Sequence, residues 1–215
     1  MALLRGDAVL AEASGPPGSR GAESLLPCID SVLREAGVGL AQVEAFAVSI
    51  GPGSFTGLRV GVATVKGLAF GDARPVAAVP TLTALAYAAG AAGAGVVALL
   101  DAQRGEFYAA GFERAAGAGP PTASALAEGV YTPHELSGRL PPGCVLVGAG
   151  AEGCAAALGG AAPRIVGSKL SLALAVGRLG QRRVDSADTL QAAELVPRYL
   201  RRAEAEVQRT GQRFE

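Results

Sequence analysis

The chain has 215 residues, half of them hydrophobic, and 19 acidic and 19 basic residues give it a formal net charge of zero. This length allows one large domain or two lobes, each with a substantial apolar core. The balanced charge excludes a strongly basic nucleic-acid-binding protein, so any contact with RNA phosphates would come mainly from a partner.

Cysteine and histidine usage narrows the class further. Cys28, Cys144 and Cys154 are scattered without a C-x-x-C pair, which is typical of reduced thiols in the cytoplasm. His134 is the single histidine, which argues against a zinc site or a His-dependent triad. No signal peptide opens the chain, and Gly, Pro or charge interrupts each apolar run. We therefore expect a cytoplasmic protein with no metal site and no membrane segment.

The first half alternates strand-like and helix-like segments. Two short apolar runs around Gly6-Asp7 predict a β-hairpin, followed by a Gly/Pro/Ser loop at residues 14–21. Apolar residues at helical spacing predict a helix from Ser24 to a stop at Gly37, with Pro27 tolerated in its first turn. The next predicted elements are a buried strand at 43–50, a glycine-rich turn with a helix after it, a strand at 75–79 and a helix at 81–89.

An Ala/Gly-rich run at residues 88–95 predicts a boundary between two lobes, residues 1–94 and 95–215. The segment GVVALLDAQRGEFYAAGF predicts a strand, a tight turn around Arg104-Gly105 and a second strand, with a loose loop after it. A short helix at 132–139, strands at 144–147 and 164–166, a helix at 170–179 and a charged tail from Gln191 complete the prediction. Strands and helices alternating in two halves indicate a two-lobed α/β protein.

The turn SIGPGSFTG joins a predicted strand to a helix, a place where backbone amides and the helix dipole can bind an anion. Gly51, Gly53 and Ser54 are the candidate anion or nucleotide residues. A Walker A loop has Lys and then Ser/Thr after its last glycine, whereas Leu58-Arg59 follows Gly57 here. The spacing therefore favours a structural turn, with nucleotide binding as the alternative.

The helix after this turn is apolar around most of its circumference. Each interior glycine costs about 1 kcal/mol of helix propensity relative to alanine, which close approach of another backbone usually compensates. Such a helix must be covered on more than one face, either within its own protein or by a helix of another chain. Gly57, Gly61, Thr64 and Leu68 form one stripe, beside a second stripe of Leu58, Val62, Val65 and Ala69.

A second glycine motif, Gly148-x-Gly150-x-x-Gly153, follows a predicted strand and formally matches the dinucleotide fingerprint. The fingerprint expects an acidic residue about 20 residues further on, and no acid appears before Asp185. A tight strand-to-helix turn is the favoured interpretation. Asp101 and Glu106 are likewise interpreted as turn residues rather than a catalytic carboxylate pair.

Five segments together resemble a known family: GPGSFTGLRVGVATVKGLAFG, VPTLTALA, DAQRGEFYAA, VGAGAE and ELVPRYLR. They are similar, in the same order, to the TsaB (YeaZ) family, a glycoprotease-like branch of the actin-like ATPase (ASKHA) fold. The resemblance covers nearly the whole chain and implies a two-lobed α/β fold with mixed sheets. It also implies that the first strand of the N-terminal lobe, in the middle of that lobe's sheet, is missing here.

The resemblance implies a non-catalytic dimerisation subunit, not an enzyme on its own. TsaB-like proteins pair with a TsaD-like catalytic subunit and a TsaE-like ATPase, which together modify adenosine 37 of tRNA with a threonylcarbamoyl group. tRNA would be contacted indirectly, no cofactor would be bound by this chain alone, and ATP or ADP could sit at the complex interface. Alone, the chain is expected to form a homodimer. The implied partner interface comprises Leu25, Leu26, Ile29, Leu33, Gly57, Gly61, Thr64 and Leu68.

Three alternatives remain open from the residues. A nucleotide-dependent kinase or ATPase of the same fold needs phosphate-contacting Asp and Thr residues that the sequence does not show. A metallopeptidase needs more ligands than a single histidine. The third alternative is a homodimeric scaffold with a different partner.

Overall fold

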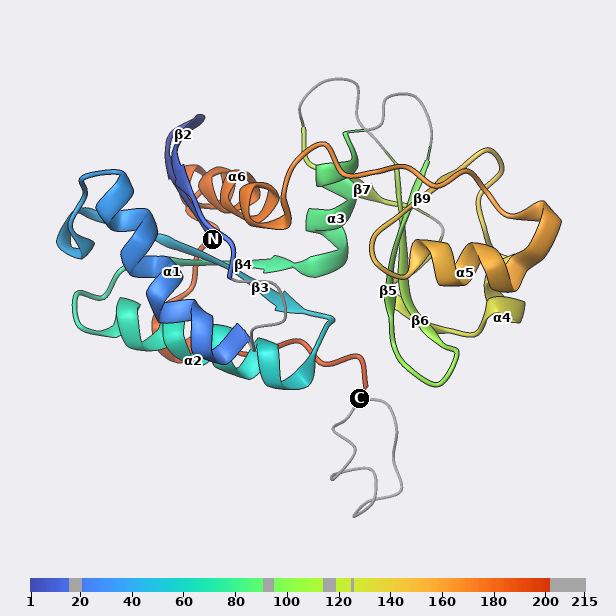
Figure 1. Cartoon of the computed structure of the whole chain (residues 1–215), viewed down its shortest axis with the longest axis horizontal. Helices are drawn as coiled ribbons and strands as arrows, with labels where there is room; N and C mark the ends of the chain where they lie inside the picture. The colour runs from blue at the N-terminus through green and yellow to red at the C-terminus, as the bar shows by residue number, and fades with distance from the viewer. Residues whose placement is uncertain (16–20, 91–94, 114–118, 125, 202–215) are drawn as a thin grey trace, which may run out of the picture. The chain divides into compact units, whose positions relative to one another are not determined.

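The computed structural model describes residues 1–15, 21–90, 95–113, 119–124 and 126–201 as a mixture of helices and strands (Figure 1). The chain divides into two compact units. The first is Met1–Val79 with Leu172–Pro197, and the second is Pro80–Ser171 with the segment that starts at Arg198. This division differs from the predicted lobes, 1–94 and 95–215, because the helix at 81–89 groups with the second unit and the chain returns to the first unit at Leu172.

The first unit contains, in its described residues, two separate two-stranded sheets, β1–β2 and β3–β4. The antiparallel β1–β2 pair confirms the predicted hairpin, and the N–H of Phe46 in β3 donates to the carbonyl oxygen of Pro75 at 3.0 Å. The elements of this unit are β1 (Ala2–Arg5), β2 (Ala8–Glu12), α1 (Gly21–Glu35), the 3-10 turn η1 (Leu40–Gln42), β3 (Phe46–Gly51), α2 (Phe55–Phe70), β4 (Val76–Pro80), α6 (Leu172–Asp185) and the 3-10 turn η3 (Ala192–Glu194).

Alternate side chains of β3 and β4 pack against different helices, because successive residues of a strand point to opposite faces. Val48 and Val76 pack in one core with Val62 of α2. Ala47 of β3 lies instead against Gly180 of α6, so close that a Cβ on Gly180 would overlap the Cβ of Ala47. The glycine therefore lets the α6 backbone approach the sheet. Gly177 of the same helix lies beside Leu4 of β1, where an added Cβ would lie 2.7 Å from a leucine methyl group that can move aside.

The second unit is built on a five-stranded sheet of order β7-β6-β5-β9, with β8 also paired to β6. β5 is antiparallel to β6 and parallel to β9. β7 and β8 lie where only a loose loop was predicted. The elements are α3 (Thr81–Ala89), β5 (Val96–Asp101), β6 (Phe107–Glu113), β7 (Thr122–Ala123), β8 (Gly129–Tyr131), α4 (Pro133–Ser137), β9 (Val145–Val147), α5 (Ala151–Leu158) and the 3-10 turn η2 (Gly159–Ala161).

Helices cover both faces of this sheet, with α3 on one side of β5 and α5 on the other (Figure 1). Val97 and Leu99 of β5 pack with Leu136 of α4 and Cys154 of α5. The alternate residue Ala98 packs with Leu82 of α3. The continuous apolar run of β5 is thus explained by burial on both faces.

Three predictions of local structure are wrong. α1 begins at Gly21 rather than near Ser24, so Pro27 lies inside the helix, at an exposed position, and removes one intrahelical hydrogen bond there. The strand predicted at 164–166 is reduced to one isolated bridge between Ile165 and Leu146, because Pro163 before it has no N–H to extend the pairing. α6 continues to Asp185, beyond the predicted end at residue 179. The predicted loop at 14–21 falls largely outside the described residues.

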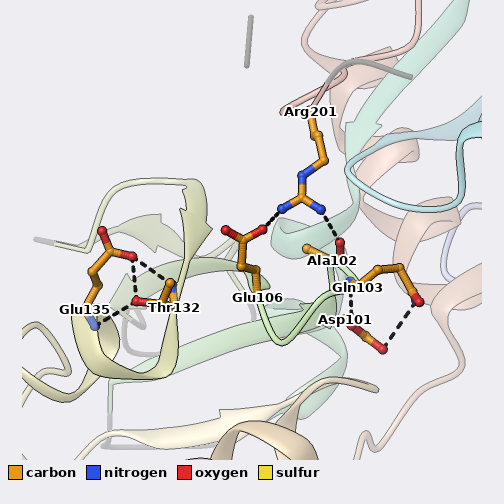
Figure 2. Close-up of polar contacts among 7 residues, drawn as sticks. All are labelled: Asp101, Ala102, Gln103, Glu106, Thr132, Glu135 and Arg201. Carbon is orange, nitrogen blue, oxygen red and sulfur yellow. Dashed lines mark hydrogen bonds and ion pairs between the residues drawn. The ribbon is translucent and has the colours of Figure 1, made fainter. Parts of the chain in front are cut away.

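α4 begins with a capping box, which Figure 2 shows. The N–H of Glu135 donates to Oγ1 of Thr132 at 3.3 Å, and the Glu135 carboxylate accepts the N–H of Thr132 at 2.8 Å. This backbone hydrogen bond is the main reason that the pKa of Glu135 lies below its ordinary value of 4.5. The first turn of α4 is therefore stabilised by a charged carboxylate.

We predict that Glu135→Gln removes a pH-dependent part of the stability. Because the pKa of Glu135 is lowered by folding, its carboxylate stabilises the folded protein at pH values above 4.5. That contribution is lost as the pH falls through the lowered, folded-state pKa. Urea unfolding of both proteins from neutral to acidic pH should show wild type more stable at pH 7 and the two proteins converging in acid. A difference independent of pH would contradict this role.

We predict that Gly180→Ala destabilises the first unit although alanine is the better helix former. Overlap with Ala47 should cost about 1–3 kcal/mol, against a propensity gain of about 1 kcal/mol. Gly67→Ala in α2 is the matched control, because no atom outside that helix turn lies within 4 Å of the added Cβ. This control should raise stability by up to about 1 kcal/mol in urea unfolding. Similar effects of the two substitutions would contradict the packing described for α6.

Candidate functional site

One side of α2 packs against its own sheet. Val62 and Ala69 are buried in the core that β3 and β4 share with η3, and Val65 packs against the same core. These residues belong to the second predicted stripe of the helix, and its remaining member, Leu58, is half-buried. The sequence predicts that α2 must be covered on more than one face, and the sheet of its own chain covers this one.

The glycine stripe is less completely covered. Gly57 is exposed, whereas Gly61, Thr64 and Leu68 are half-buried. The neighbouring helix α1 packs against α2. A Cβ added at Gly61 would meet no atom within 4 Å, and one added at Gly57 would meet only the side chain of Ser54. Within the described part of this chain, no other backbone approaches Gly61 closely enough to explain a glycine there.

A third side of α2 faces outward, and sequence reasoning did not single it out. Ala63, Gly67 and Phe70 are exposed, and Phe70 is 75% exposed. A Cβ at Gly67 also meets nothing within 4 Å. Their spacing of four and then three residues was a readable signal, because such residues share one helix face. α2 therefore presents a slender, apolar strip to its surroundings.

α1 contributes apolar side chains next to α2. Leu25, Ile29 and Leu33 are half-buried, as expected of an amphipathic helix packed on one side. Leu26 is 60% exposed, which makes it one of the most exposed large apolar residues of the described chain. Asp30 and Arg34 form an ion pair one turn apart on this helix. The eight residues predicted for the interface are thus distributed over two adjacent helices, with Leu26 and Gly57 the most accessible.

The two cations of α2 bind within their own chain. The guanidinium of Arg59 stacks over the ring of Phe55, 4.7 Å from its centroid. Nζ of Lys66 donates to the carbonyl oxygens of Ala193 and Leu195, at 3.1 Å each. Both positive charges on α2 are therefore already in contact with groups of the same chain.

The candidate anion turn is built as a helix start. Gly51 has a φ of 122°, which favours glycine, and both Gly51 and Pro52 are buried. Ser54 is the N-cap of α2, and its Oγ accepts the N–H of Gly57 at 3.3 Å. One amide of the first turn is already bonded in this way. The contacts thus describe a structural role for Gly51 and Ser54, while nucleotide binding there stays a prediction.

The second glycine motif serves packing between β9, α5 and β5. A Cβ on Gly148, whose φ is 106°, would overlap the carbonyl oxygen of Leu99. A Cβ on Gly150 would lie 2.8 Å from the carbonyl carbon of Leu100. The protein's own strand β5 thus occupies the space that a pyrophosphate would need at these glycines, which supports the predicted tight turn.

Two of the family-like segments meet in the second unit (Figure 2). Arg201, from ELVPRYLR, donates to the carbonyl oxygen of Ala102 at 2.6 Å and forms an ion pair with Glu106, both in DAQRGEFYAA. Asp101 accepts the N–H of Gln103 at 2.6 Å. The turn between β5 and β6 holds both Gln103 and Arg104 at positive φ. Asp101 and Glu106 therefore act in the turn, as predicted.

Neither a metal cluster nor a membrane span is found in the part of the chain that the structure describes. No group of three or more His, Cys, Asp or Glu side chains there could hold a metal ion. None of the helices in these ranges combines the length and apolar character needed to cross a bilayer.

Comparisons with known proteins agree with this architecture. The family model described as TsaD, tRNA N6-adenosine threonylcarbamoyltransferase, matches residues 19–152, more than half of the chain. The tRNA threonylcarbamoyladenosine biosynthesis protein TsaB of Haemophilus influenzae is 49% identical over 39% of this chain, and that of Escherichia coli is 37% identical over 43%. The matched regions span only 36% and 41% of those two relatives.

A solved structure extends the likeness to most of the chain. YeaZ from Pseudomonas aeruginosa superimposes with a TM-score of 0.69 and 31% identity, covering 83% of this chain and 84% of that structure. The fold is accordingly the glycoprotease-like, actin-like ATPase fold. With a family model matched over more than half of its length and a YeaZ structure matched over most of it, the chain belongs to the TsaB (YeaZ) family.

Proposed function

We propose that this chain is a non-catalytic subunit that acts in tRNA threonylcarbamoyladenosine biosynthesis by binding a TsaD-like catalytic subunit through α1 and α2. The observation that carries the proposal is the open space at the Cβ positions of Gly61 and Gly67 in α2, a helix that packs against α1, where Leu26 is exposed. Glycines in a helix interior lower its stability, and nothing within this chain's described residues compensates for them. A helix of another chain packed closely against α2 would do so.

The physical basis of the complex is burial of apolar helix surface. Small residues let two helix backbones approach closely, and Leu26 and Phe70 supply larger apolar side chains to an interface. A standard interface buries about 800 Å² per partner. The same strip supports a homodimer when the partner is absent, because one exposed apolar patch can pair with its own copy.

The pathway in our proposal, tRNA threonylcarbamoyladenosine biosynthesis, comes from the names of the relatives. TsaB proteins of two bacteria are described as tRNA threonylcarbamoyladenosine biosynthesis proteins, and the matching family model is that of a tRNA-modifying transferase. In our proposal the partner carries the catalytic residues, a TsaE-like ATPase joins the complex, and tRNA is contacted through the complex. ATP or ADP, where required, binds at the subunit junction. Asp101 and Glu106, which are engaged in the β5–β6 turn, take no catalytic role.

We predict that Gly61→Leu abolishes binding to the TsaD-like subunit while the monomer stays folded. A Cβ at this position meets no atom within 4 Å in the free chain, whereas a leucine side chain would fill the space needed by a partner helix. Affinity should therefore fall about 100-fold or more in calorimetric titration, about 2.7 kcal/mol. Gly138→Leu is the matched control, because it too has no atom within 4 Å but lies at the end of α4 in the second unit. Unchanged affinity of Gly61→Leu would contradict the proposed interface, and ATP hydrolysis by the chain alone would contradict a non-catalytic role.

We predict that Leu26→Lys weakens both self-association and partner binding by about tenfold, about 1.4 kcal/mol. The substitution replaces exposed apolar area with a charge that would lose water in the interface. Ile165→Lys is the control, since Ile165 is also an exposed large apolar residue but lies in the second unit. Sedimentation equilibrium and titration should separate the two variants, while urea unfolding should place both within about 0.5 kcal/mol of wild type. Equal association of the two variants would argue against α1.

A further inference from the structure

The chain passes from the first unit to the second between Pro197 and Arg198, and it is held on both sides of this crossing. The segment concerned, residues 193–201, is named here the coupling strap. Its contacts differ from those of the proposed partner surface, and the inference below does not depend on the proposed function.

In the first unit the strap is fastened to α2. Nζ of Lys66 donates to the carbonyl oxygens of both Ala193 and Leu195, at 3.1 Å. Leu195 is fully buried in the core with Val62 and Ala69. One charged side chain and one buried leucine thus attach the strap to the same helix.

In the second unit two arginines of the strap bind two glutamates. Arg198 forms an ion pair with Glu128 at 2.6 Å, and the Glu128 side chain is only 15% exposed. Arg201 bonds to Glu106 and to the carbonyl oxygen of Ala102, at the two ends of the β5–β6 turn. Hydrogen bonds between charged groups in such partly buried places are stronger than neutral ones.

The connection between the two units at this point is short. Only Val196 and Pro197 lie between Leu195 and Arg198, and a chain of this length spans at most about 11 Å between those two residues. Pro197 also restricts the backbone through its fixed φ. The contacts of Leu195 and those of Arg198 are therefore separated by only two residues of chain.

The β5–β6 turn is the element that would respond. Gln103 and Arg104 both have positive φ, at 65° and 59°, which is unfavourable for residues with a side chain. The contacts of Arg201 with Ala102 and Glu106 hold the ends of this turn together. We infer that the coupling strap links the local stability of α2 around Lys66 to that of the β5–β6 turn, so that a change at either one is felt at the other.

Hydrogen–deuterium exchange of the full chain tests this inference with Lys66→Met. Two hydrogen bonds report on the turn, from Ala102 N–H to Glu106 O at 2.9 Å and from Glu106 N–H to Gln103 O at 3.1 Å. Loss of the Lys66 contacts should raise exchange within the strap and also at these two amides, by about fivefold or more. Arg59→Met, which removes the other cation of α2, should leave both regions unchanged. Faster exchange in the strap with an unchanged turn would overturn the inference.

The reverse experiment keeps the inference testable if Lys66→Met fails to fold. Because coupling between two sites is reciprocal, Arg201→Met should speed exchange of the Glu194 N–H, which bonds to Gln191 O at 3.0 Å in the first unit. Arg139→Met is the control in the second unit, where Arg139 stacks on Tyr131 outside the strap. A response confined to the β5–β6 turn in Arg201→Met would overturn the inference equally.

Discussion

The packing of α2 on the β3–β4 strands is the constraint on which the rest of the first unit depends. Burial of Val62 and Ala69 in that core sets the rotation of the helix. Once this rotation is set, the Cβ positions of Gly61 and Gly67 have open space around them, and Gly67 and Phe70 are exposed. The surface that we propose for a partner is thus set by how the helix packs on its own sheet.

Two pairs of glycines lie in opposite kinds of surroundings. Gly180 and Gly148 lie where the chain's own atoms leave no room for a side chain, so they allow close packing inside a unit. Gly61 and Gly67 have free space around them and only weaken α2 in the isolated chain. The first pair explains close packing within the fold, and for the second pair we propose a binding partner.

Segments far apart in the sequence meet at Arg201, which is 95 residues from its partner Glu106. This contact explains why two short polar motifs occur together in one chain: each supplies half of an ion pair around a turn with unfavourable backbone angles. Through Lys66 and Leu195, the same stretch of chain is attached to the helix that carries the proposed partner surface. The residues around Leu195 and Arg201 thus contact α2 on one side of the crossing and the β5–β6 turn on the other.

Local patterns alone predicted most of the elements. Alternating apolar runs located β5 and β6, and the helix after the glycine-rich turn was predicted from its apolar stripes, because these signals depend on neighbouring residues only. Failures occurred where distant contacts decide. α6 continues past Leu179, and the residue that follows, Gly180, packs on Ala47 of β3, which lies far away in the sequence. The single bridge at Ile165 is an exception, because the adjacent Pro163 limits the pairing locally. The short strands β7 and β8 are formed by pairing with β6. Their own residues show no strand pattern from which this pairing could be predicted.

The sequence by itself determined the α/β class, from its alternating strand and helix patterns, and the family, from the order of its motifs. The two helices proposed to bind a partner follow from the resemblance to that family. Which side of α2 is open, and what holds Asp101, Glu106 and Lys66, was decided only by the tertiary structure. The reason is physical: a helix pattern shows which residues share a face, but the face that is buried depends on the elements that pack against it. Polar side chains likewise acquire their roles from partners that the fold brings within hydrogen-bonding distance.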